Sequence, residues 1–148
     1  MSEIKLLHLS SQDLSRRQRR QLAKLIEEGF AWSPALIITE LASEQTQFIV
    51  IEKERKMIAY LSYRQIFDQA DLIQIYVRPE WRKQGYGQRL IAALQRIDSI
   101  QVIYLEVRVS NRSAINLYQQ SAFELRGSRL DYYQQPREDA FIMIWERR

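Results

Sequence analysis

The segment Val77-Arg-Pro-Glu-Trp-Arg-Lys-Gln-Gly-Tyr-Gly87 is the most informative part of the chain, since it holds two of only four glycines. An alternating strand pattern over residues 72–77 leads into it. A helical pattern over residues 86–97 follows it, with an apolar stripe that includes Leu90 and Leu94. The segment is therefore expected to be a loop that joins a strand to a helix.

A loop of this kind can hold a phosphate group. Gly85 and Gly87 let the backbone approach a ligand closely, and the amides and dipole at the helix start attract anions. Arg82 and Lys83 add positive charge. The alternative is an ordinary strand-to-helix turn. A dinucleotide-binding Rossmann unit is disfavoured because its third glycine would fall on Leu90, and a Walker loop is excluded because no Gly-Lys-Ser/Thr follows.

Patterns on both sides of this loop predict a mixed sheet. Strand signals fall on residues 47–52, 57–66, 72–77, 102–109, 123–133 and 140–146. Helical patterns fall on residues 13–30, 34–43, 86–97 and 111–121. Ser33 before Pro34 is a typical helix start, and so is Asn111. We expect one domain, residues 1–148, of the α/β class, with helices on the faces of the sheet.

Composition narrows the function classes. A chain of 148 residues, 46% apolar and 27% charged, suits one globular core, and its size favours a monomer. The chain has no cysteine, which excludes a thiolate site, and His8 has no second histidine with which to bind a metal. No apolar run reaches the roughly 20 residues that span a bilayer, and the start is unlike a signal peptide, so we expect a cytoplasmic protein without a membrane partner.

The net charge of +4 suggests an acidic partner such as a phosphorylated cofactor or RNA. Arg16, Arg17, Arg19 and Arg20 lie largely off the apolar stripe of the first helix. They could meet RNA or form a solvated face. We favour the solvated face and expect no direct nucleic-acid binding.

Two motifs carry a family resemblance. The pattern R-x-x-G-x-G at residues 82–87 follows a Val-x-Pro strand end, and N-x-x-A-x-x-L-Y occupies residues 111–118. Together they resemble the core motifs of the Gcn5-related N-acetyltransferase (GNAT) superfamily, over residues 48–145. This resemblance implies a mostly antiparallel central sheet flanked by helices, with a V-shaped split between two central parallel strands.

Three further segments are similar to the bacterial ribosomal-protein-alanine N-acetyltransferases. They are AWSP at residues 31–34, LEVR followed by Ser110-Asn111 at residues 105–111, and YY followed by REDA at residues 132–140. Members acetylate the N-terminal alanine of a small-subunit ribosomal protein, the eighteenth by its usual name. The resemblance thus implies acetyl-CoA as cosubstrate, no metal, and the N-terminus of a ribosomal protein as acceptor.

The resemblance also assigns residues to acetyl-CoA. Those expected to contact it are Tyr76, Val77, Arg82, Lys83, Gln84, Gly85, Tyr86, Gly87, Gln88, Asn111 and Tyr118. At Tyr76 and Val77 the backbone would hydrogen-bond the acetyl carbonyl or the pantetheine arm, so their side chains matter little. Asn111 would cap its helix and could also touch the pantetheine arm.

Glu106 lies among apolar residues in the middle of a predicted strand and shares a face with Tyr104 and Arg108. It matches the family's general base, which would take the amine proton directly or through water. An N-terminal amine needs less help than a lysine, because its unperturbed pKa of about 7.7 to 8.0 leaves it partly neutral at physiological pH. The alternative is a structural carboxylate paired with Arg108 or a nearby lysine.

Tyr118 matches the family's general acid, which would protonate the departing sulfur of coenzyme A. The alternative is helix packing. Trp32, Tyr132, Tyr133 and Arg137 would line a groove for the acceptor peptide. Surface tyrosines in a hairpin also occur without any ligand.

The sequence departs from the family at two positions and leaves other functions open. Ala31 stands where the family usually has proline, and Ala122 where it usually has glycine. A left-handed backbone at Ala122 would cost about 1 kcal/mol. The acceptor could instead be a lysine side chain, a polyamine or another small amine. A catalytically silent CoA- or ribosome-binding module is a second alternative, against which Glu106 and Tyr118 argue.

Overall fold

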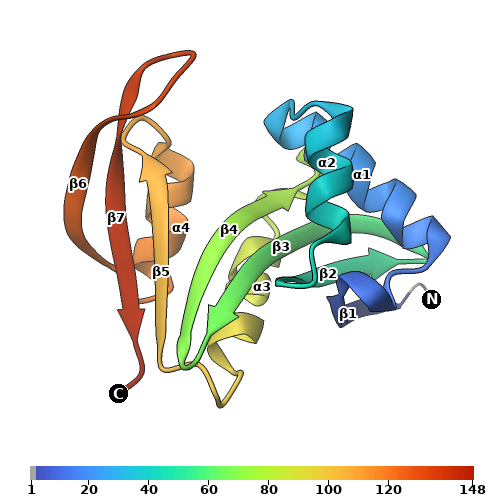
Figure 1. Ribbon diagram of the computed structural model, residues 1–148. Coiled ribbons are helices and arrows are strands. Elements are labelled where there is room, and N and C mark those ends of the chain that lie inside the picture. Colours follow the sequence, from blue (N-terminus) through green and yellow to red (C-terminus); the bar gives the residue numbers. More distant parts are fainter. Residues whose placement is uncertain (1–2) are drawn as a thin grey trace. The chain divides into compact units, whose positions relative to one another are not determined.

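The computed structural model describes residues 3–148, which form a seven-stranded sheet with helices on its faces (Figure 1). The hydrogen-bonded strand order is β1-β2-β3-β4-β5-β7-β6. The strands are β1 (Ile4–Ser10), β2 (Thr46–Lys53), β3 (Lys56–Ile66), β4 (Gln69–Val77), β5 (Val102–Arg108), β6 (Glu124–Tyr133) and β7 (Glu138–Glu146). The α-helices are α1 (Arg16–Phe30), α2 (Pro34–Ala42), α3 (Tyr86–Gln95) and α4 (Arg112–Gln120).

β4 and β5 form the parallel pair of this mostly antiparallel sheet. Their ladder joins Gln69 to Val102, Ala70 to Ile103 and Asp71 to Tyr104. The other strand pairs with a described register, β1–β2, β2–β3, β5–β7 and β6–β7, are antiparallel. The α/β class and the mixed, mostly antiparallel sheet predicted from the sequence are confirmed.

The chain groups into two compact units. The first unit holds the residues up to Arg64 together with Ile73–Leu94, and the second holds Gln65–Leu72 together with Gln95–Arg148. β3 and β4 contribute residues to both units. The loop at residues 78–85, predicted to hold a phosphate group, therefore belongs to the first unit, whereas Glu106 and Tyr118 belong to the second.

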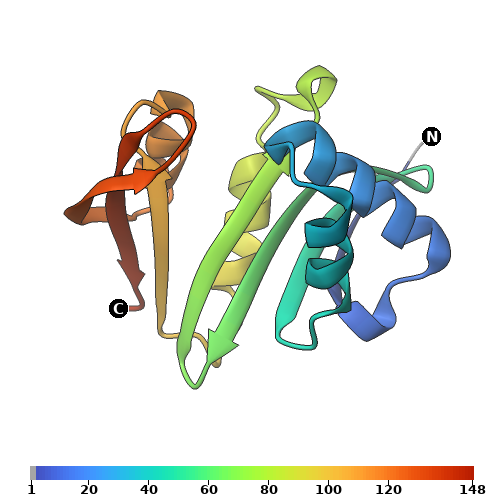
Figure 2. The same cartoon turned by 45° about the horizontal axis from the view of Figure 1, so that its top comes forward.

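In the first unit, α1 and α2 cover one face of the strands and α3 covers the other (Figure 2). The residues that form the core beneath α1 and α2 include Leu22 and Ile26 of α1, Ile37 of α2, and Phe48 and Val50 of β2. Because successive strand side chains point to opposite faces, Ile49 and Ile51 point away from that core, and both are fully buried. A strand buried on both faces in this way reads as a continuous apolar run.

Helix boundaries follow local capping chemistry. α1 begins at Arg16, three residues later than the predicted start, because the Ser15 hydroxyl accepts a hydrogen bond from the amide of Gln18 and the Gln18 side-chain oxygen accepts one from the amide of Ser15. Residues 11–13 form a short 3-10 turn instead. α2 begins at Pro34 behind the Ser33 cap, as predicted.

One strand is missing from the sequence prediction. Residues 4–10 lie outside the strands predicted from the sequence, but they form β1, which pairs along its whole length with β2. This strand forms one edge of the sheet.

In the second unit, β7 lies between β5 and β6, and α4 is the helix of this unit (Figure 1). The apolar face of β5 is buried, with Ile103, Leu105 and Val107 each at most 5% exposed. The predicted alternation is thus confirmed, and Glu106 lies on the opposite, less buried face. Across residues 3–148, no helix has the length and apolar character needed to span a membrane.

Candidate active site

The loop between β4 and α3 has the backbone expected of a ligand-binding turn. Pro79–Trp81 form one 3-10 turn, and Lys83 and Gly85 then adopt positive φ angles of 61° and 86°. The first helical hydrogen bond runs from the amide of Arg89 to the carbonyl of Gly85 at 3.0 Å. The amides of Tyr86 and Gly87 precede this bond and have no helical carbonyl to reach. They lie where an anion would meet the positive end of the helix dipole.

Arg82 ties this loop to the end of β4. Its Nε–H donates to the carbonyl of Val77 at 2.8 Å, and its guanidinium lies 5.4 Å from the centre of the Tyr76 ring. The Gln84 side chain makes a longer bond, 3.4 Å, to the carbonyl of Glu80. Arg82 thus holds the loop conformation, and its exposed position and that of Lys83 leave positive charge at the surface.

Tyr76 connects β4 to the end of α1. Its hydroxyl donates to Glu28 Oε2 at 2.7 Å, and burial, followed by this hydrogen bond, raises the pKa of the phenol. A Cβ on Gly29 would lie 2.6 Å from the Tyr76 ring, so glycine is required there by close contact. Trp32, just beyond α1, is partly buried against the core beneath α1 and α2.

Glu106 has a partner on each carboxylate oxygen. The hydroxyl of Tyr132 donates to Oε1 at 3.1 Å, and the Nε of Arg129 lies 2.6 Å from Oε2. Oε2 is inaccessible to solvent and its contact with Arg129 is an ion pair without the alignment of a hydrogen bond. Arg129 also donates to the Tyr104 hydroxyl at 3.1 Å. The structural alternative predicted an ion pair with Arg108 or a lysine, and the partner is Arg129 instead.

Arg108 organises the loop that joins β6 to β7. It pairs with Glu138 at 3.1 Å and donates to the carbonyls of Pro136 and Gln134 at 3.0 and 3.3 Å. Its guanidinium also lies 4.4 Å from the centre of the Tyr133 ring. Hydrogen bonds from Ser110, and then Arg108, keep the pKa of Glu138 below its ordinary value. Five contacts therefore fix this loop and its two ends, Tyr133 of β6 and Glu138 of β7, while Arg137 within the loop is exposed.

Tyr118 is buried at the end of α4. The amide of Phe123 donates to the carbonyl of Tyr118 at 3.0 Å, and the amide of Ala122 donates to that of Gln119 at 3.1 Å. This is a Schellman ending, completed by contact between the Tyr118 and Phe123 rings, whose centres lie 5.7 Å apart. Burial, with a smaller contribution from Tyr133, raises the pKa of the Tyr118 hydroxyl. The phenol therefore keeps its proton at physiological pH.

At the other end of α4, the side-chain oxygen of Asn111 accepts a hydrogen bond from the amide of Ala114 at 3.3 Å. The predicted helix cap is confirmed. Ala122 has a φ of 71°, which confirms the left-handed conformation considered for a residue that replaces the family's glycine.

The predicted residues fall into two sets, one in each unit. The first unit contains Trp32 and the acetyl-CoA set Tyr76, Val77, Arg82, Lys83, Gln84, Gly85, Tyr86, Gly87 and Gln88. The second unit contains Glu106, Asn111, Tyr118, Tyr132, Tyr133 and Arg137. Within the second unit, the structure brings Glu106 into contact with Tyr132.

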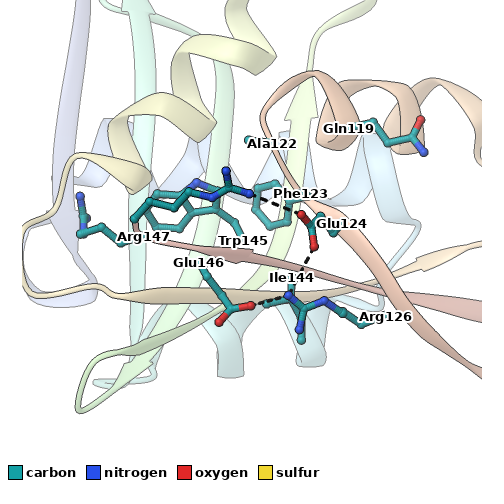
Figure 3. Close-up of a pocket in the computed structure, with 10 residues that line it drawn as sticks. Gln119, Ala122, Phe123, Glu124, Arg126, Ile144, Trp145, Glu146 and Arg147 are labelled. Atoms are coloured by element: carbon teal, nitrogen blue, oxygen red, sulfur yellow. Dashed lines mark hydrogen bonds and ion pairs between the residues drawn. The ribbon is translucent and has the colours of Figure 1, made fainter.

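The second unit also contains a cavity of about 800 Å³, and none of the predicted site residues lines it (Figure 3). Its lining includes Phe123, Arg126, Trp145, Glu146 and Arg147, and none of the predicted catalytic residues. The charged groups that line it bond to one another or to carbonyls: Arg126 pairs with Glu146, and Arg147 donates to the carbonyl at the end of α3. Figure 3 shows the first of these pairs within the cavity wall.

Sequence reasoning missed Arg129, Tyr104 and Glu28 as partners of predicted site residues. Arg129 is 23 residues beyond Glu106, on a strand that β7 separates from β5, so no local pattern pointed to it. Glu28 is 48 residues before Tyr76. Only Tyr104 was indicated by the sequence, because the alternation of β5 places it on the same face as Glu106.

Comparison with known proteins decides the family. The model of the acetyltransferase (GNAT) family matches residues 12–123, most of the chain. This chain belongs to the acetyltransferase (GNAT) family. Within it, the chain is 33% identical over 122 residues to the [ribosomal protein bS18]-alanine N-acetyltransferase of Escherichia coli K12, covering 78% of this chain and 80% of that protein. It is 28% identical over 138 residues to the N-alpha-acetyltransferase RimI of Mycobacterium tuberculosis, covering 88% and 87%.

Solved structures agree with the family. The crystal structure of the ribosomal-protein-S18-alanine N-acetyltransferase from E. coli matches with a TM-score of 0.80 at 27% identity, over 96% of this chain and 94% of that one. Arabidopsis thaliana NAA60 in complex with acetyl-CoA matches in fold, with a TM-score of 0.79 at 12% identity over 97% and 100%. As a GNAT protein, this chain is an N-acetyltransferase that uses acetyl-CoA as cosubstrate.

Proposed function

We propose that this GNAT protein moves the acetyl group of acetyl-CoA to the N-terminal α-amine of a protein, namely the N-terminal alanine of ribosomal protein bS18. Relatives named as [ribosomal protein bS18]-alanine N-acetyltransferases, which match this chain over about 80% of their length, support the acceptor. We further propose that the protein acts as a monomer in the cytoplasm and recognises the acceptor as a protein, without binding RNA.

The observation that carries the chemistry is that the second unit holds both a carboxylate with fixed partners, Glu106, and a buried phenol, Tyr118. Glu106 supplies the carboxylate, held at 2.6 Å from the Nε of Arg129. Tyr118 is buried, and its raised pKa keeps a proton available for donation. Acetyl transfer needs both, since an amine must lose a proton and a thiolate must gain one.

In the proposed reaction the neutral amine attacks the thioester carbonyl, a C–N bond forms and the C–S bond breaks. Glu106 receives the amine proton, and Tyr118 supplies its phenolic proton to the departing sulfur; before the next turnover Glu106 gives its proton to water and Tyr118 regains one from water. The amides at the start of α3, with Lys83 and Arg82, hold the pyrophosphate of CoA. The backbone of Tyr76 and Val77 and the side chain of Asn111 contact its pantetheine arm. Trp32, Tyr132, Tyr133 and Arg137 line the path of the acceptor peptide.

The acceptor is tested with synthetic peptides. One peptide carries the mature N-terminus of bS18, and a matched peptide has that N-terminus blocked but contains a lysine. After incubation with acetyl-CoA, mass spectrometry is expected to find acetyl groups on the α-amine of the first peptide only. Acetylation of the lysine peptide or of spermidine, with none on the α-amine, would reject the proposed acceptor while keeping the acetyltransferase activity.

The base is tested with Glu106→Gln. The substitution removes the proton acceptor and is expected to lower kcat by about 10²- to 10⁴-fold, with the dissociation constant of acetyl-CoA unchanged. Because the amine loses its proton unaided above a pKa of about 8, part of the loss should be recovered at pH 9 to 9.5. Glu146→Gln is the matched control, since Glu146 on β7 also pairs with an arginine of β6. Equal turnover of Glu106→Gln and the parent would reject Glu106 as the base.

The acid is tested with Tyr118→Phe, which keeps the buried ring and removes only the hydroxyl. We expect kcat to fall by about 10²-fold or more because the thiolate then leaves unprotonated. Far-ultraviolet circular dichroism and the thermal midpoint serve as folding controls. An unchanged kcat would show that Tyr118 serves only for packing.

A further inference from the structure

The two carboxylate oxygens of Glu106 have different surroundings. Oε2 is inaccessible to solvent and lies 2.6 Å from Arg129 Nε. Arg129 is itself held in place by the Tyr104 hydroxyl, and this hydrogen bond, followed by the charge of Glu106, raises the pKa of the guanidinium. An acceptor amine therefore has no route to Oε2, and any proton that reaches Glu106 must arrive at Oε1.

Tyr132 lies at Oε1. Its hydroxyl donates to this oxygen at 3.1 Å, while 48% of the residue is exposed. A phenol oxygen that has given its hydrogen to one partner still has lone pairs with which to accept another. The hydroxyl hydrogen of Tyr132 therefore points to the Glu106 carboxylate, and the lone pairs of the hydroxyl oxygen can accept a hydrogen bond from an incoming N–H.

The Tyr132 ring is held by aromatic and cationic neighbours. The Tyr133 ring meets it edge-on with centres 5.0 Å apart, and the Arg129 guanidinium lies 5.9 Å from its centre. Partial burial, followed by the hydrogen bond to Glu106, raises the pKa of the hydroxyl. The phenol thus remains neutral, as a group that passes on a proton must be.

We propose that Tyr132 is a catalytic residue whose hydroxyl relays the proton of the acceptor amine to Glu106, with Arg129 as the positioning residue. As the C–N bond forms, an N–H bond of the amine breaks and its proton moves to the Tyr132 oxygen. The phenolic proton of Tyr132 moves at the same time to Glu106 Oε1. Tyr132 ends as it began, and Glu106 becomes a neutral carboxylic acid that returns its proton to water after product release. This inference rests on the proposed role of Glu106 as base.

The relay is tested with Tyr132→Phe and the bS18 peptide, under saturating acetyl-CoA. The ring and its packing remain, so KM for the peptide is expected to stay within about twofold, whereas kcat falls by about 10- to 100-fold. The proton inventory in H₂O/D₂O mixtures is expected to be curved in the parent, where two protons move, and linear in Tyr132→Phe. Tyr63→Phe is the control for loss of a tyrosine hydroxyl, because Tyr63 lies in β3 of the first unit, outside this cluster.

Arg129 is tested in parallel by Arg129→Gln and Arg129→Lys. We expect Arg129→Gln to lower kcat with little change in KM, and Arg129→Lys to regain part of the loss, because an ammonium still neutralises Oε2. The matched control is Arg126→Gln, which breaks a glutamate pair on the same strand but does not touch Glu106. Equal kcat values for Arg129→Gln and Arg126→Gln would remove Arg129 from the proposal.

The two proposals fail in different ways. If Glu106→Gln turns over like the parent, Glu106 is not the base and the proposed function fails with the relay. If Glu106→Gln is impaired but Tyr132→Phe keeps the parental kcat and a curved inventory, only the relay is wrong and water reaches Oε1 directly. A rise in KM alone in Tyr132→Phe would likewise reject the relay and leave Tyr132 as a wall of the peptide groove.

Discussion

At Gly85, in the loop between β4 and α3, the backbone conformation explains why the residue is a glycine. Its φ of 86° is one that L-residues with a Cβ rarely adopt, whereas a Cβ built at this position would meet no atom within 4 Å. The glycine is therefore required by conformation, and space for a larger residue is present. Lys83, two residues earlier, accepts a φ of 61° at the same turn, where a single left-handed residue is tolerable at some cost.

Gly85→Ala is expected to cost about 1 kcal/mol of folding stability and to turn the amides of Tyr86 and Gly87 away from the proposed pyrophosphate site. The dissociation constant of acetyl-CoA, measured by calorimetry, should therefore rise. Gly127→Ala on β6 is the control, since its Cβ would meet only Ile142 at an ordinary 3.9 Å and it lies outside the loop. Equal affinities of the two variants for acetyl-CoA would show that the loop tolerates another backbone path.

At the scale of elements, the end of α4 connects fold stability to the proposed acid. The Schellman hydrogen bonds close on Tyr118, and the left-handed residue that permits them is Ala122. An alanine there accepts the strain that a glycine would avoid. Alanine in place of the family's glycine therefore lowers the stability of this helix end, although it removes no chemical group from the site.

Ala122→Gly is accordingly expected to stabilise the protein. Release of left-handed strain should outweigh the greater freedom of glycine in the unfolded chain, for a net gain of about 0.5 to 1 kcal/mol in the free energy of unfolding. Urea denaturation at pH 7.5 measures this gain. The control, Ala114→Gly within α4, should instead lose about 1 kcal/mol. A loss of stability in both variants would mean that Ala122 carries no strain.

At the scale of the whole molecule, buried tyrosines make the free energy of unfolding depend on pH in the alkaline range. Burial raises the pKa of Tyr60 in the first unit and of Tyr118 in the second, and raises the pKa of Tyr133 to about 12. In the unfolded chain these phenols lose their protons near pH 10. Above that pH the folded state binds more protons than the unfolded state, so stability is complete below about pH 10 and falls as the pH rises further.

The expected result is a lower free energy of unfolding at pH 11 than at pH 8.5, measured with urea. Tyr60→Phe should lower stability at both pH values, because Gln74 loses the hydroxyl that donates to it at 2.9 Å. The difference between the two pH values should nevertheless be smaller in Tyr60→Phe than in the parent, since one titrating phenol is gone. An unchanged difference would contradict the assignment of Tyr60 to this pH dependence.

The sequence by itself determined what short-range chemistry controls. Among residues 3–148, alternation and helical spacing located the four α-helices and six of the strands. Ser33 and Asn111 marked two helix starts, and the glycines of residues 82–87 marked the turn before α3. β5 alternated as predicted, which put Glu106 on the face opposite the core. These features follow from backbone angles and neighbouring residues, so they can be read locally. The strand at residues 4–10 was missed because its pairing with β2 lies more than 35 residues away.

Only the tertiary structure decided the partners of the site residues. Arg129 reaches Glu106 from β6, beyond the intervening β7, and replaces the Arg108 pairing that sequence neighbours suggested. Arg108 instead pairs with Glu138 and donates to the carbonyl of Gln134 in the loop between β6 and β7. Arg82 donates to the carbonyl of Val77. Strand order sets which side chains meet, and it depends on the packing of the sheet as a whole. Periodicity along one strand carries no information about which strands become its neighbours.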